Sequence, residues 1–181
     1  APGTRYRVGI CQNPEVARYT STVTIRAADG IGGIATSGWR GRSHSLGIAD
    51  AVTVLAADAA MSDVAATIVA NAVDVPGSVH VQRQAAVSLN PDSDLGHLPV
   101  TVGVSRLPAS QRSDALASGV RVAEALYRAD LLMGAYLHLQ GESAVVGTVI
   151  RNTGRAHYLT NAAHGTHKPG GHLAGQSVAL A

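Results

Sequence analysis

The spacing of apolar and polar side chains predicts short β-strands over most of the first third of the chain. Residues 6–11 and 21–27 alternate with a period of two, and the second segment is rich in β-branched side chains. An Asp-Gly pair at 29–30 predicts a turn, so residues 32–36 are expected to pair back as a hairpin partner. A continuous apolar run over 51–57 predicts a buried strand.

Two longer segments have the period of an amphipathic helix. Asp58 is a good N-cap residue, so the first helix is expected to begin there and to end before Pro76-Gly77. The second helix is introduced by Pro108 and Ser110 and extends to Asp130. The apolar stripe expected on the first helix consists of Met61, Val64, Ala65, Ile68, Val69 and Ala72.

Further strands are expected at 79–84, 98–107, 133–139 and 144–150, the last two forming a closing hairpin. Together, the predicted strands and helices indicate an α+β fold, in which two main helices pack on an antiparallel sheet. We expect one domain over residues 1–150. From residue 151 the periodicity is lost, so residues 151–181, rich in Gly and His, are expected to form a surface arm or a partly disordered tail.

The amino-acid composition argues against several classes of protein. With 14% charged and 46% apolar residues the chain is globular rather than disordered. The formal net charge is only +2, and the arginines are scattered along the sequence without an aromatic stacking set, so a nucleic-acid partner is not expected. No apolar run reaches membrane-spanning length, which argues against a membrane protein. Cys11 is the single cysteine, which excludes internal disulfides and fits a cytoplasmic location.

A polar loop over residues 37–50 is the first candidate for chemistry, because long loops inside compact domains are frequently functional. Thr36, Ser37 and Gly38 offer hydroxyls and backbone amides to a phosphate, with Arg40 or Arg42 as partners. The alternative for these three residues is an ordinary β-turn.

Asp63 and Thr67 are the second candidate. They are four residues apart and therefore share one face of the first helix, where a carboxylate and a hydroxyl suit Mg²⁺. A solvated helix face is the alternative. His44 in the polar loop is a candidate acid/base residue, against the alternative of a hydrogen-bonded loop histidine. In the tail, His164 and His167 have a metal-binding spacing, but the neighbouring glycines favour weak adventitious binding.

Residues 35–73, ATSGWRGRSHSLGIADAVTVLAADAAMSDVAATIVANAV, resemble the ApbE-like superfamily, and NPDSDLG and LHLQGESAVVG extend the resemblance over about residues 6–147. The closer similarity is to the uncharacterised bacterial and archaeal branch rather than to the flavin transferases. The resemblance implies a T-fold-like half domain that binds FAD, FMN or a related nucleotide with Mg²⁺. It implies Asp63 and Thr67 as metal ligands, and Thr36, Ser37 and Gly38 near the flavin. In the hypothesis that follows, Arg42 and His44 face the phosphates of the ligand. His44 matches the loop histidine of the family.

The chain departs from the flavin transferases at two places. His44-Ser45-Leu46-Gly47 stands where those enzymes have His-Ile-x-Asp-Pro, and their N-terminal half has no counterpart before residue 6. FMN transfer to a protein threonine is therefore left open. We expect a second chain carrying the missing half, or a homo-oligomer, to complete the site. Two alternatives remain: an accessory enzyme of sulfur assimilation into homocysteine, with Cys11 as the carrier, and a non-catalytic subunit of a heteromer.

Overall fold

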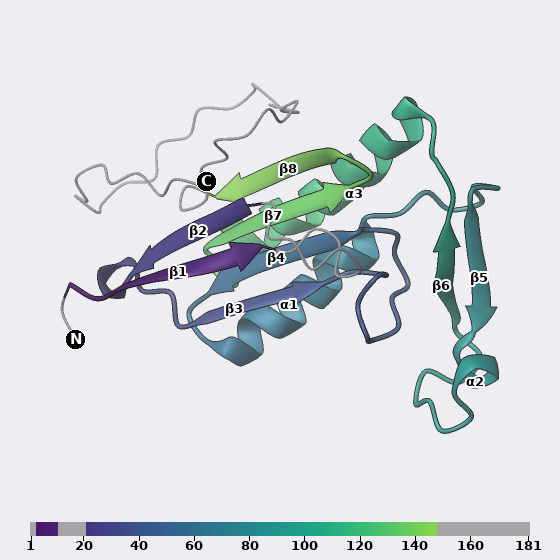
Figure 1. The fold of residues 1–181 in the computed structure, drawn as a ribbon, viewed down its shortest axis with the longest axis horizontal. Coiled ribbons are helices and arrows are strands. Elements are labelled where there is room, and N and C mark those ends of the chain that lie inside the picture. Colours follow the sequence, from purple (N-terminus) through teal and green to yellow (C-terminus); the bar gives the residue numbers. More distant parts are fainter. Residues whose placement is uncertain (1–2, 11–20, 148–181) are drawn as a thin grey trace.

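An antiparallel sheet of four strands is the centre of the fold, in the order β3 (Gly33–Ser37), β4 (Ala51–Ala56), β7 (Gly134–Leu139) and β8 (Glu142–Gly147) (Figure 1). The computed structural model describes residues 3–10 and 21–147. In the register of the sheet, Thr53 of β4 lies opposite Thr36 of β3 on one side and Tyr136 of β7 on the other. The predicted α+β class, with an antiparallel sheet and two main helices on it, is confirmed.

Two helices, α1 (Ala59–Ala72) and α3 (Ala109–Arg128), cover one face of the sheet (Figure 1). The helix α1 begins as predicted, since Asp58 caps it by accepting a hydrogen bond of 2.8 Å from the N–H of Met61. The larger core lies between these helices and the sheet. Its fully buried side chains are almost all small or branched, among them Val52, Val54, Val69, Leu116 and Leu137.

The opposite face of the sheet is covered by a hairpin of β1 (Arg5–Ile10) and β2 (Ser21–Arg26), followed by the short 3-10 helix η2 (Ala27–Asp29). A smaller core joins the hairpin to the sheet. It consists of Ile10, Val23, Ile25, Leu55 and Tyr136, with Val8, Ile31, Ile34 and Val145 packed against it.

A second hairpin, β5 (Val81–Ala85) and β6 (Pro99–Val104), stands beside this body and carries the short helix α2 (Ala86–Leu89) (Figure 1). Polar contacts fix its base. The guanidinium of Arg83 donates to the carboxylate of Asp74 at 2.5 Å and also to the carbonyl of Leu46, while Thr101 N–H donates to the carbonyl of Ser45.

Two predictions on pairing and packing were wrong. Strand β3 pairs with β4 instead of β2, because β2 pairs with β1 across the sheet face. On α1 the buried residues are Ser62, Ala65, Ala66, Val69 and Ala70, so Val64 and Ile68 are 55% and 45% exposed. The buried stripe is rotated by one residue because the close contact of α1 with β3 and β4 favours serine and alanine over branched side chains. Cys11 and the predicted tail at 151–181 lie outside the described residues.

Candidate functional site

A pocket of about 410 Å³ lies at the C-terminal end of β3. Its walls come from the end of β3 and the loop after it, from the start of β4 and from one side of α1. The lining residues are Thr36, Ser37, Gly38, Arg40, Gly41, Arg42, Ser43, Asp50, Ala51, Asp63 and Thr67. The volume falls within the roughly 300–1,000 Å³ common for small-molecule and cofactor sites.

The fold brings together most of the site residues predicted from the sequence. Both predicted groups line this pocket: Thr36, Ser37, Gly38 and Arg42 on one side, and Asp63 and Thr67 on the other. They come from segments about thirty positions apart, so their meeting is a result of the pairing of β3 with β4 and the packing of α1. The exception is His44, which is exposed on the loop and does not line the pocket.

The end of β3 is shaped by a very close approach of two backbone segments. A Cβ atom on Gly38 would lie 2.5 Å from the carbonyl oxygen of Asp50 and 2.8 Å from that of Ala49, so only glycine fits there. Beside it, the hydroxyls of Thr36 and Thr53 are 2.8 Å apart across the two strands. Thr36 is also a lining residue of the pocket, and its hydroxyl is held by this partner on β4.

Asp50 anchors the pocket loop and is not among the site residues predicted from the sequence. Its carboxylate is 8% exposed, and one oxygen accepts from Arg40 Nε at 2.9 Å and from Trp39 Nε1 at 3.2 Å. The other oxygen accepts from the backbone N–H of Gln140 at 2.6 Å. Arg40 also lies over the Trp39 ring, 4.5 Å from its centroid. The signal in the sequence was an acidic residue directly before a buried strand, where a charge needs partners.

The free charges of the pocket are Arg42 and Asp63. Both are exposed, and neither makes an ion pair or side-chain hydrogen bond within the described part of the chain. Asp63 and Thr67 are one helical turn apart on the pocket side of α1. No group of three or more His, Cys, Asp or Glu side chains that could hold a metal occurs among residues 3–10 and 21–147.

A protein-family model described as AbpE bacteria matches residues 1–145, which contain every residue of the pocket. The chain belongs to this bacterial AbpE family. No curated protein and no solved structure matched the chain. None of the helices in the described part of this AbpE chain is long and apolar enough to cross a membrane.

In the AbpE chain a polar cluster also lies on the hairpin side of the sheet. The hydroxyl of Ser143 is 2.7 Å from the Tyr136 hydroxyl and 2.9 Å from His138 Nδ1, and the rings of Tyr136 and His138 stack at 6.4 Å. Burial lowers the pKa of His138 from its ordinary value of 6.5, and the negative charge of Asp50 partly opposes this.

The lowered pKa of His138 predicts a pH-dependent stability. The unfolded chain binds the proton at a higher pH than the folded chain, so this histidine stabilises the fold above pH 6.5 and loses that contribution as the pH falls through its folded pKa. Urea denaturation measures the free energy of unfolding of the wild type and of His138→Gln. We expect the stability advantage of the wild type over this variant to be larger at pH 8 than at pH 5. An equal difference at both pH values would contradict this assignment.

Proposed function

We propose that the pocket binds a flavin nucleotide, FAD or FMN, or a related nucleotide, together with Mg²⁺, as an ApbE-like site. The main support is that one pocket gathers Thr36, Ser37, Gly38, Arg42, Asp63 and Thr67, the residues that the sequence predicts at the ligand and the metal. Backbone and hydroxyl groups at the end of a strand, opposite a carboxylate, suit a ligand with both phosphates and a bound cation.

The donor set fits Mg²⁺ better than a transition metal. Mg²⁺ is held by one or two carboxylates together with waters and substrate phosphates, and it prefers oxygen ligands. Asp63 and Thr67 supply a carboxylate and a hydroxyl that have no other partner among the described residues. The second carboxylate of the pocket, Asp50, is occupied on both oxygens by Arg40, Trp39 and Gln140. When bound, Mg²⁺ would neutralise phosphate charge.

In this proposal the remaining residues have separate roles. Thr36, Ser37 and Gly38 contact the ligand, and the guanidinium of Arg42, which has no ion-pair partner among the described residues, faces its phosphates. Asp50 does not touch the ligand but holds Arg40 and the loop in position. The acid/base role predicted for His44 stays a prediction, since this side chain is outside the pocket lining.

We also propose that a second chain, either a partner with the complementary half or another copy, covers the pocket side of α1. The support is the exposure of Val64 (55%) and Ile68 (45%), which directly follow Asp63 and Thr67 along the helix. Exposed apolar residues beside a binding site are typical of an interface. If the chain acts only as a structural subunit, this interface would form while the pocket binds no nucleotide.

A titration of FAD into the protein tests the proposal, with and without Mg²⁺. Trp39 is the single tryptophan and lies in the pocket loop, so its fluorescence reports on binding. We expect Asp63→Asn and Thr67→Val to weaken the Mg²⁺-dependent affinity at least about tenfold, since losing even an outer partner of a metal ligand costs roughly 10–100-fold. The same samples are followed by sedimentation, which reports whether a second chain is present.

The matched control is Asp114→Asn, which removes an exposed carboxylate on α3 that does not line the pocket. It is expected to bind like the wild type. Equal weakening by Asp114→Asn and Asp63→Asn would show a general charge effect and would refute the metal role of Asp63.

A further inference from the structure

The outer face of the β1–β2 hairpin gathers three arginines that are scattered in the sequence. In the antiparallel register Arg5 lies directly opposite Arg26, and Arg7 lies opposite Thr24. Side chains alternate between the two faces of a strand. Since Val23 and Ile25 are buried against the sheet, Thr24 and Arg26 point outward, together with Arg5 and Arg7. We call the surface of Arg5, Arg7 and Arg26 the arginine face.

The arginines of the arginine face form no ion pair within the described chain. Within residues 3–10 and 21–147, none of the three guanidinium groups makes an ion pair or a hydrogen bond to another side chain. The nearest carboxylate in sequence, Asp29, accepts a hydrogen bond of 2.8 Å from the backbone N–H of Arg26. Like charges directly opposite each other in an antiparallel pair destabilise it. The pairing of Arg5 with Arg26 is therefore unfavourable unless an anion joins them.

We propose that the arginine face binds a phosphate group of a small ligand. Opposed side chains start about 4.5–5.5 Å apart and diagonal ones about 7–8 Å apart, so three long arginine side chains can converge on one phosphate. Arginine is suited to this because its planar guanidinium binds phosphate through two parallel hydrogen bonds. A polyanion is a poorer fit, because tight binding of a nucleic acid uses roughly 6–10 phosphate contacts and this face offers three cations.

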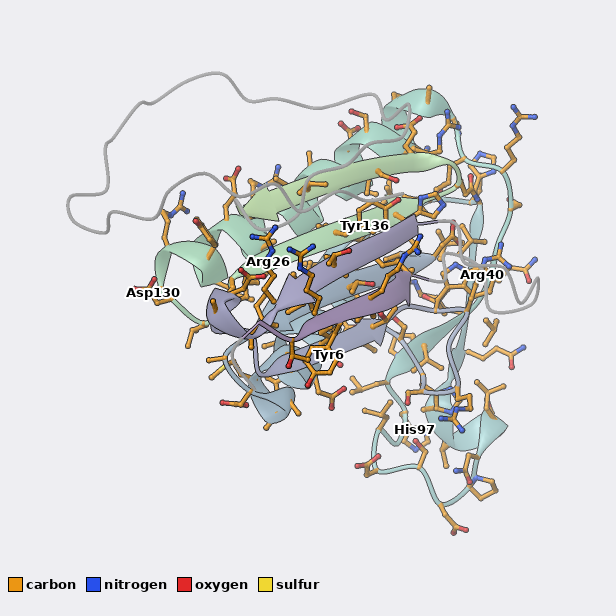
Figure 2. All side chains as sticks on the ribbon, turned by 60° about the vertical axis from the view of Figure 1, so that its left-hand side comes forward. Tyr6, Arg26, Arg40, His97, Asp130 and Tyr136 are labelled. Atoms are coloured by element: carbon orange, nitrogen blue, oxygen red, sulfur yellow. The ribbon has the colours of Figure 1, made fainter. Side chains whose placement is uncertain are left out.

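This site is separate from the pocket. Arg26 ends β2, close to where β3 begins, whereas Arg40 and Arg42 follow the opposite end of β3. Figure 2 accordingly shows Arg26 and Arg40 well apart. The inference does not rest on flavin or Mg²⁺ binding, and either site could exist without the other.

Inorganic pyrophosphate is the probe, titrated into the full chain without Mg²⁺ by calorimetry and by ¹H–¹⁵N NMR of the backbone amides. We expect saturable binding that shifts amides in residues 5–10 and 21–26. Arg7→Gln and Arg26→Gln should each weaken it about tenfold, as expected for the loss of hydrogen bonds to a charged group. Arg106→Gln, an exposed arginine outside both sites, is the matched control and should retain the binding. Arg42→Gln serves only to tell the two sites apart, since it alters the pocket and should leave the amide shifts of the hairpin in place.

The melting temperature of the variants without any ligand shows whether they are folded. Because Arg26→Gln removes a like-charge pair, its melting temperature without pyrophosphate should equal or exceed that of the wild type, which excludes misfolding as the cause of lost binding. Three results would overturn the proposal: no saturable shift in the hairpin, loss of binding in Arg42→Gln with retention in Arg26→Gln, or a response only to anionic vesicles or an oligonucleotide.

Discussion

Replacing Gly47 with alanine is expected to lower the free energy of unfolding by about 3 kcal/mol or more, at the upper end of overpacking effects. A Cβ atom at this position would lie 2.1 Å from the carbonyl oxygen of Ala70 and 2.8 Å from Cα of Asn71. These neighbours are backbone atoms of the last turn of α1 and cannot rotate away. The loop cannot retreat either, because Leu46 N–H donates to Asn71 Oδ1 and Ile48 N–H donates to the carbonyl of Val73.

Urea denaturation of Gly47→Ala measures this effect, with Gly103→Ala in β6 as the control. The neighbours of a Cβ at Gly103 are atoms of the flexible Gln82 side chain, so the control is expected to change stability by less than about 1 kcal/mol. A loss for Gly47→Ala no larger than for Gly103→Ala would mean that the loop at Gly47 is not in close contact with the backbone of α1.

The second large effect is expected for Asp50→Ala, which should cost about 2–3 kcal/mol of stability. The substitution leaves the Nε1 of Trp39, the Nε of Arg40 and the N–H of Gln140 without their acceptor. Removing one partner of a fully buried pair costs roughly 3–5 kcal/mol. The expected loss is smaller here because the Arg40 side chain is 24% exposed and regains water.

Trp39 makes the local consequence of this substitution visible. Because its indole N–H loses the hydrogen bond to Asp50, its NMR resonance should shift and its emission move to longer wavelength in Asp50→Ala. Asp114→Ala, with an exposed carboxylate on α3, should change stability by no more than about 0.5 kcal/mol and leave Trp39 unaffected. Unchanged Trp39 signals in Asp50→Ala would refute the anchoring role of Asp50.

The sequence predicted those elements that short-range patterns determine. The cap at Asp58 and the strand β4 depend on neighbouring residues, and both were found within a residue of the predicted positions. The rotation of α1 was not predictable in the same way. Alanine, valine and isoleucine occur on every side of this helix. The spacing of apolar residues alone therefore does not decide whether Val64 or Ala66 faces the sheet. Close contact with β3 and β4 decides it.

The site residues also divide into those that short-range spacing predicts and those that contacts between distant segments determine. Asp63 and Thr67 were recognisable because a spacing of four places two side chains on one helix face. Asp50 was not, since its partners come from the pocket loop and from Gln140, which is 90 positions away. The choice of β4 rather than β2 as the partner of β3 is also non-local, and this pairing brings Thr36 to the pocket.

The central claim is that the pocket binds a flavin nucleotide through Mg²⁺ held by Asp63 and Thr67. Its most direct test is the affinity of the wild-type protein for FAD, measured through Trp39 fluorescence in Mg²⁺ and again after the metal is removed with a chelator. We predict saturable binding in Mg²⁺ that weakens at least about tenfold when the metal is removed. Absence of FAD binding, or binding of equal strength in both conditions, would contradict the claim.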